Sequence, residues 1–100
     1  MPQEAVEDLL MHAWMETRNS DRVRVLKVIH GYGSSGKGGQ TLLIVRNWAS
    51  RMKGRLRAVI DGEDFSIYSA ETRAMRREVG EIDDAELDAG NRGVTYLWIK

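Results

Sequence analysis

The stretch that decides the fold is Val25-Leu26-Lys27-Val28-Ile29-His30-Gly31-Tyr32-Gly33-Ser34-Ser35-Gly36-Lys37-Gly38-Gly39. The apolar run over 23–29 predicts a strand that is central in a sheet and buried on both faces. A single histidine ends this strand, and a loop over 31–39 follows with five glycines, two serines and a lysine. Glycine has no Cβ and allows positive φ, so the backbone N–H groups of such a loop can approach a ligand closely.

This glycine-rich loop is typical of a site for an anionic oxygen, above all a phosphate. A helical pattern begins at about Gln40, and a helix N-terminus adds unpaired N–H donors and the positive end of the helix dipole. The loop also comes close to the phosphate loop of nucleotide hydrolases, because Gly31-x-x-x-x-Gly36-Lys37 fits that pattern. Residue 38 is a glycine where a serine or threonine would hold Mg²⁺, so we do not expect nucleotide hydrolysis.

The spacing of apolar residues elsewhere predicts helices that alternate with strands. Apolar residues recur at helical spacing from Val6 to Ala13 and predict a helix over 3–16. The third helix is expected to begin at the N-cap Ser69 and to stop at Gly80. The other expected elements are a helix over 41–52, a strand over 56–60, a helical turn over 83–87 and a strand over 94–99. We therefore expect one α/β domain over 1–100, a two-layer α+β sandwich with a mixed sheet.

The composition is that of an ordinary globular chain of 100 residues, with 42% apolar and 30% charged residues. The absence of cysteine excludes disulfides and thiolate chemistry and removes the usual ligands of structural zinc. No apolar run approaches the ~20 residues of a membrane span, and the N-terminus lacks the basic and apolar regions of a signal peptide. We expect a cytoplasmic protein without membrane contact.

Charge is distributed unevenly along the chain, although the formal net charge is +0. Residues 1–20 and 61–100 are acidic, whereas residues 21–60 carry nine Lys/Arg against the single carboxylate of Asp21. The basic middle includes five cations on or after the expected second helix: Arg46, Arg51, Lys53, Arg55 and Arg57. Such a segment favours a polyanionic partner. The alternative is a solvated surface balanced by its acidic neighbours.

Two motifs of this chain resemble the Smr family, the small MutS-related domains. Ile29-His30-Gly31-Tyr32-Gly33 is similar to the family's His-Gly-x-Gly motif, and Gly93-Val94-Thr95-Tyr96-Leu97-Trp98-Ile99 is similar to its closing strand. Between them, Val45-Arg46-Asn47-Trp48 resembles the family's second helix. The resemblance covers most of 3–60 and 90–100 and makes 65–89 an insertion. The family's N-terminal Leu-Asp-x-His strand has no counterpart in the sequence.

The resemblance implies a fold similar to the C-terminal domain of translation initiation factor three, here without the N-terminal strand. It implies a domain that binds nucleic acid, DNA or RNA, by structure rather than by sequence. It further implies a nicking endonuclease that hydrolyses phosphodiesters. The alternative is a non-catalytic module that binds nucleic acid or a partner protein. The cofactor stays open, with a divalent metal ion among the candidates, and so does the oligomeric state. No residue is assigned to a metal.

The candidate catalytic residue is His30, because a neutral imidazole at a strand end can accept a proton or donate to a phosphate oxygen. The structural alternative is a histidine that satisfies a backbone carbonyl near the loop. Tyr32 is a candidate for base stacking, and the resemblance places Arg92 beside the glycine loop. The expected residues of the phosphate site are Gly31, Tyr32, Gly33, Ser34, Lys37, Arg92 and Gly93.

Overall fold

The computed structural model describes residues 2–32, 37–81 and 84–100. Over these residues the chain forms three α-helices, three strands and three short 3-10 helices. In chain order they are α1 (Gln3–Asn19), β1 (Val25–Ile29), α2 (Lys37–Arg51), η1 (Lys53–Arg55), β2 (Ala58–Asp61), η2 (Gly62–Asp64), α3 (Ala70–Val79), η3 (Asp84–Glu86) and β3 (Val94–Trp98). The predicted alternation of helices and strands is confirmed, and the architecture is a small α+β domain.

The three strands form an antiparallel sheet in the order β1-β3-β2. The register places Val25 of β1 opposite Trp98 of β3, and Ala58 of β2 opposite the same residue. The expectation of a mixed sheet is therefore wrong for the described residues. β1 and β2 run in the same direction, but β3 lies between them, so each strand bonds only to an antiparallel neighbour.

The central strand is β3, and the prediction of a central, fully buried strand at 23–29 is wrong. All five residues of β3 are buried, whereas β1 is half-buried and its Ile29 is 75% exposed. β1 lies at an edge of the described sheet. An apolar run indicates that a strand packs against a core, but the neighbours of that strand are set by distant segments of the chain.

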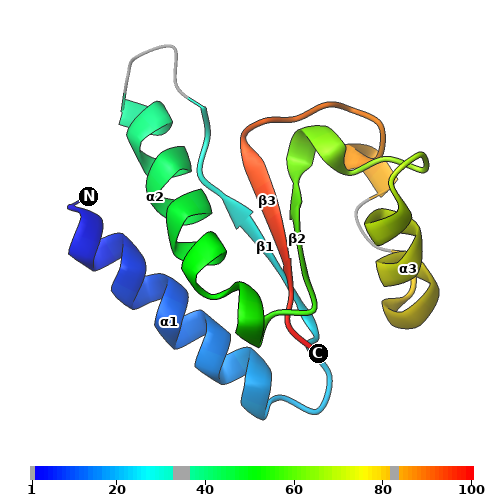
Figure 1. Cartoon of the computed structure of the whole chain (residues 1–100), viewed down its shortest axis with the longest axis horizontal. Coiled ribbons are helices and arrows are strands. Elements are labelled where there is room, and N and C mark those ends of the chain that lie inside the picture. Colours follow the sequence, from blue (N-terminus) through cyan, green and yellow to red (C-terminus); the bar gives the residue numbers. More distant parts are fainter. Residues whose placement is uncertain (1, 33–36, 82–83) are drawn as a thin grey trace.

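The helices cover the two sides of the sheet unequally. Figure 1 shows α1 and α2 side by side on one side of the sheet, and α3 on the other side next to β2. Successive residues of β3 face opposite sides, so Leu97 joins the core under α1 and α2, while Tyr96 and Trp98 join the core with Phe65 and Met75. β3 therefore contributes to both cores.

The ends of α3 follow the predicted signals, but α2 begins earlier than predicted. The Ser69 hydroxyl accepts a hydrogen bond from the amide of Thr72 at 3.2 Å, and Gly80 ends the helix with φ 105°. α2 begins at Lys37, so the two glycines that follow belong to its first turn rather than to the loop. Glycine destabilises a helix more in its interior than at its end. Within the described residues, no helix has the length and apolar character to traverse a bilayer.

Candidate phosphate site around His30

Two loops meet at one end of the sheet: the residues after β1 and the turn before β3. The backbone amides of His30 and Gly31 both donate to the carbonyl oxygen of Gly93, each at 2.9 Å. A Cβ on Gly93 would lie 3.4 Å from Gly31 Cα and 3.4 Å from Tyr32 Cδ1, so a glycine at this position eases the approach of the two loops. We call residues 30–32 and 91–93 the loop pair. It is the neighbourhood that the resemblance implied.

The loop pair presents an exposed ring and an exposed cation. Tyr32 is 58% exposed, and the side chain of Arg92 is 63% exposed, with its Nε 3.9 Å from Glu63 Oε2. The predicted site residues Gly33 and Ser34 lie outside the described residues. Lys37 begins α2, and its side chain is likewise outside the description. The structure thus brings together the part of the predicted site that it describes.

The imidazole of His30 is buried and has a hydrogen-bond partner at each ring nitrogen. Its Nδ1 lies 2.6 Å from the carbonyl oxygen of Gly31, and its Nε2 lies 2.8 Å from Thr95 Oγ1. A carbonyl oxygen only accepts, so Nδ1 carries the proton and the Thr95 hydroxyl donates to Nε2. This is the geometry of the structural alternative, a histidine bonded to a backbone carbonyl. In this arrangement both ring nitrogens are occupied.

Burial favours the neutral form of the His30 imidazole. Burial lowers its pKa below the ordinary value, and the positive charge of Arg46 acts in the same direction. The Gly31 carbonyl and the carboxylates of Asp61 and Glu63 act in the opposite direction but do not reverse the shift. A neutral imidazole is the form that a proton acceptor requires.

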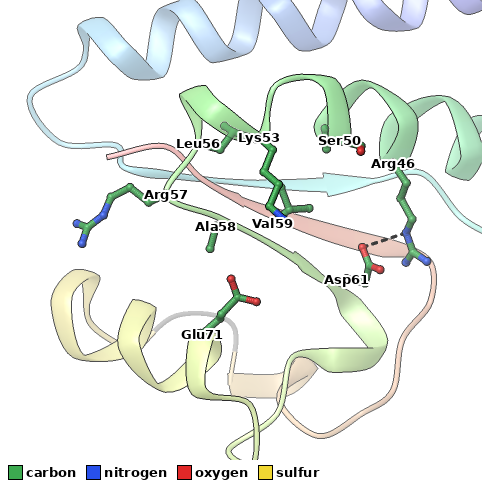
Figure 2. A pocket seen from close by; sticks show the side chains of 10 residues that line it. Arg46, Ser50, Lys53, Leu56, Arg57, Ala58, Val59, Asp61 and Glu71 are labelled. Atoms are coloured by element: carbon green, nitrogen blue, oxygen red, sulfur yellow. Dashed lines mark ion pairs between the residues drawn. The ribbon is translucent and has the colours of Figure 1, made fainter.

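A polar network extends from His30 to the carboxylates after β2. The guanidinium of Arg46 donates to both carboxylate oxygens of Glu63, at 2.9 and 2.7 Å. Its Nε lies 3.3 Å from Asp61 Oδ1 and 3.5 Å from Thr95 Oγ1. Figure 2 shows Arg46 reaching from α2 to Asp61 at the end of β2. We call His30, Thr95, Arg46, Asp61 and Glu63 the His30 network.

The two carboxylates of the network have opposite pKa shifts. Burial raises the pKa of Asp61 above its ordinary value, although the nearby Arg46 opposes this. Hydrogen bonds from Arg46 lower the pKa of Glu63. Arg46 itself has a raised pKa, because its bonds to Glu63 and the charge of Asp61 outweigh the effect of burial. Glu63 is therefore the firmly ionised partner of Arg46.

The sequence motifs do not single out three members of the His30 network as site residues. In the sequence analysis, Thr95 belongs only to the closing-strand motif, and Asp61 and Glu63 only mark the end of a strand. The sequence places Arg46 on a basic surface, whereas the structure pairs it inside the domain. Two signals point to these residues: a threonine within an otherwise apolar final strand, and a run of acids directly after a strand.

Gly62 holds the turn after β2 against the segment before β3. A Cβ at Gly62 would overlap the carbonyl oxygen of Asn91 and would lie 2.5 Å from Val94 Cγ2. The Asn91 side chain accepts a hydrogen bond from the amide of Gly93 at 2.8 Å and donates to Glu86 at 2.8 Å. This contact places the carboxylates of the His30 network beside the loop pair.

Three of the five cations predicted for one basic surface are paired with acids. Besides Arg46, Arg51 pairs with Glu7 at 2.6 Å and Arg57 pairs with Glu78 at 2.8 Å. For these three residues, the acidic segments at either end of the chain balance the basic middle. The charge around His30 is balanced in the same way by the carboxylates of 61–64.

Two grooves border the His30 network. One of about 370 Å³ lies between α2, β2 and α3 and is lined by Arg46, Lys53 and Glu71 among others (Figure 2). The other, of about 340 Å³, lies beside β1, is lined mainly by apolar residues of α1, β1 and α2, and includes His30. Within 2–32, 37–81 and 84–100, no group of three or more histidines and carboxylates is placed to hold a metal ion.

Comparison with known proteins finds no match for this chain. No protein-family model matches the chain, and neither the curated proteins nor the solved structures give a match. An assignment of function therefore rests on the sequence motifs and on the chemistry of the loop pair and the His30 network.

Proposed function

We propose that this chain is an Smr-like nucleic-acid-binding domain whose loop pair receives a backbone phosphate. The observation that carries the proposal is the meeting of the two glycine-containing loops at the Gly93 carbonyl, beside exposed Tyr32 and Arg92. An arginine binds phosphate oxygens through charged N–H donors, and a tyrosine ring stacks on bases. Contacts to the backbone and to an unpaired base select structure rather than sequence, in DNA or RNA.

The proposal includes the fold and the location of the protein. β1 is an edge strand of the described sheet, and the apolar groove of about 340 Å³ lies beside it. A strand ahead of α1, as in the fold similar to the C-terminal domain of translation initiation factor three, would pair with this edge and make the sheet mixed. Residues 65–89, which include α3 and η3, would be an insertion in that fold. We place the domain in the cytoplasm.

In the catalytic form of this proposal, His30 accepts a proton during phosphodiester hydrolysis. Its Nε2 is the unprotonated nitrogen, and the residue borders the apolar groove. The Thr95 hydroxyl would turn away, and a water molecule would lose its proton to Nε2 as its oxygen attacks phosphorus. One P–O ester bond breaks, and the protonated imidazole gives its proton to the leaving oxygen, so the products are a phosphate monoester and a hydroxyl end. Arg92 would offset the negative charge that develops on the phosphate.

A non-catalytic binding module is the second candidate, and the hydrogen bonds of His30 favour it. Both ring nitrogens are occupied, and the partner Thr95 is 0% exposed. In this candidate, His30 fixes the first residues of the glycine loop. Binding then depends on Arg92 and Tyr32, without proton transfer.

Nicking and binding assays on the same preparations separate the two candidates. An enzyme loses cleavage by about 10²–10⁴-fold in His30→Gln and keeps its affinity for nucleic acid. A binding module shows no cleavage in the parent and loses affinity in Arg92→Gln. Arg77→Gln, an exposed arginine on α3, is the matched control. Full cleavage by His30→Gln would contradict the catalytic role. Unchanged affinity in both Arg92→Gln and Tyr32→Ala would contradict the phosphate site.

A further inference from the structure

Basic residues gather at the end of the sheet opposite to the loop pair. The antiparallel register brings the starts of β1 and β2 together with the end of β3, and Figure 1 shows the end of α1 and the connection to β2 at the same end. The segments 18–24, 53–57 and 98–100 carry seven Lys/Arg and one carboxylate, that of Asp21. We call these cations the basic pole: Arg18, Arg22, Arg24, Lys53, Arg55, Arg57 and Lys100.

Direct contacts join the three segments into one surface. The Lys100 Nζ donates to the carbonyl oxygen of Arg18 at 3.0 Å, and the Arg24 Nε donates to the carbonyl oxygen of Lys100 at 2.6 Å. The indole of Trp14 donates to the carbonyl oxygen of Arg55 at 3.4 Å, and the Arg18 guanidinium carbon lies 5.4 Å from the Trp14 ring centroid. The amide of Arg57 also donates to the carbonyl oxygen of Trp98 at 2.7 Å, so the three segments meet at one end of the domain although they are far apart in the sequence.

Most cations of the basic pole lack the carboxylate partners that Arg46 has near His30. Four cations of the basic pole are exposed and have no carboxylate partner among the described residues: Arg18, Arg22, Lys53 and Arg55. Arg57, by contrast, pairs with Glu78 and covers the ring of Trp98 at 4.0 Å. Exposed cations without carboxylate partners at one end of a domain attract a polyanion.

We infer that the basic pole binds the phosphate backbone of nucleic acid, at a site separate from the loop pair. Exposed guanidinium and ammonium groups contact phosphate oxygens and give affinity that does not depend on sequence. A lipid surface fits less well, because the three segments expose a single large apolar side chain among their residues, Val23 at 46%. The inference goes beyond the proposed function and holds whether or not the loop pair binds phosphate.

The test is fluorescence anisotropy with a short mixed-sequence DNA duplex and a single-stranded RNA, titrated at several salt concentrations. The double variant Arg22→Glu/Arg55→Glu should bind at least about tenfold more weakly, with a log–log salt slope smaller by roughly one for each phosphate that the variant no longer neutralises. The single variant Arg73→Glu is the control for the single variants Arg22→Glu and Arg55→Glu, because it changes the net charge equally at an exposed position of α3. Its affinity should stay within about twofold of the parent.

Each outcome of this test supports or overturns the inference. Equal losses of affinity in Arg73→Glu and in the single variants Arg22→Glu and Arg55→Glu would show that affinity follows total charge, which overturns the basic pole. Polyglutamate or anionic vesicles that bind as tightly as nucleic acid would overturn the assignment to nucleic acid. If Arg22→Glu/Arg55→Glu keeps the affinity of the parent and Arg92→Gln binds more weakly, the basic pole is overturned and the loop pair is supported. If Arg22→Glu/Arg55→Glu binds more weakly and Arg92→Gln keeps the affinity of the parent, the basic pole is supported and the loop pair is overturned. The neutral variant Arg22→Gln/Arg55→Gln repeats the test if charge reversal prevents folding.

Discussion

The Nε2 of His30 lies 2.8 Å from the Oγ1 of Thr95, and this hydrogen bond joins the residue after an edge strand to the fully buried central strand. The single hydroxyl proton of Thr95 is directed at His30, because the guanidinium of Arg46 approaches the same oxygen as a donor. The Thr95 hydroxyl therefore connects the imidazole of the candidate site to the core.

Replacing that hydroxyl should destabilise the domain. In Thr95→Val the shape of the side chain is kept, but Nε2 of buried His30 loses its donor, which should cost about 1–3 kcal/mol of unfolding free energy. Thr95→Ser keeps the hydroxyl donor and is the control for the loss of the hydrogen bond to His30. Urea denaturation measures both. A Thr95→Val protein as stable as the parent would show that the hydrogen bond contributes nothing to folding.

The lowered pKa of His30 predicts a loss of stability in acid. The unfolded chain takes up a proton near the ordinary pKa of 6.5, but the folded chain does so only at lower pH. The stability from this group is therefore fully present above pH 6.5 and declines as the pH falls from 6.5 to the lowered value. The raised pKa of Asp61 acts in the opposite direction, since it favours the folded chain as the pH falls toward 3.8.

A comparison of variants isolates the contribution of His30. Between pH 7 and about pH 5, the unfolding free energy of the parent should fall more than that of His30→Gln. Thermal or urea unfolding across this pH range provides the measurement. Parallel curves for the parent and His30→Gln would be inconsistent with the prediction.

Gly62 should tolerate no side chain. In Gly62→Ala the new methyl group would overlap the Asn91 carbonyl oxygen and press on Val94, which should cost about 1–3 kcal/mol or more. Gly54→Ala is the matched control, because a Cβ at Gly54 meets nothing within 4 Å. Thermal melting of both variants tests this. Equal melting temperatures would mean that the turn after β2 can move away without loss.

The Arg46–Glu63 pair should show a larger coupling than a surface pair. A double-mutant cycle with Arg46→Met and Glu63→Gln should give roughly 1–3 kcal/mol, because both side chains are partly buried and the contact is bidentate. The contact between Arg57 and Glu78 is also bidentate, but both side chains are more exposed, so the same cycle there should give less than about 1 kcal/mol. Equal coupling in the two cycles would contradict a special role for burial.

Sequence signals that act over a few residues predicted the elements well. The cap at Ser69 and the stop at Gly80 depend on hydrogen bonds and backbone angles within one turn, and both are found. The position of a strand in the sheet is not a local property. The runs at 25–29 and 94–98 are both largely apolar, and only their pairing makes the second one central.

The local features of the candidate site were predictable from the sequence, but the contacts between distant residues were not. The histidine at the end of the strand and the glycines after it are visible in the sequence, and the resemblance implied that Arg92 lies near them. The partner of His30 was not predictable, because Thr95 is 65 residues away and reaches it only through the register between β1 and β3. The pairing of Arg46 with Asp61 and Glu63 also depends on how α2 crosses the sheet.

The central place of β3 has a consequence for how the protein forms during synthesis. The strand that β1 and β2 both require is made last of the three. Neither of the earlier strands has a described partner until residues 94–98 have left the ribosome, so the sheet forms late through contacts distant in sequence. Nascent chains arrested before Val94 are expected to show no protease-resistant core. Until then, α1 and α2 have only each other to cover their apolar sides, and such exposed apolar surface favours aggregation of the nascent chain.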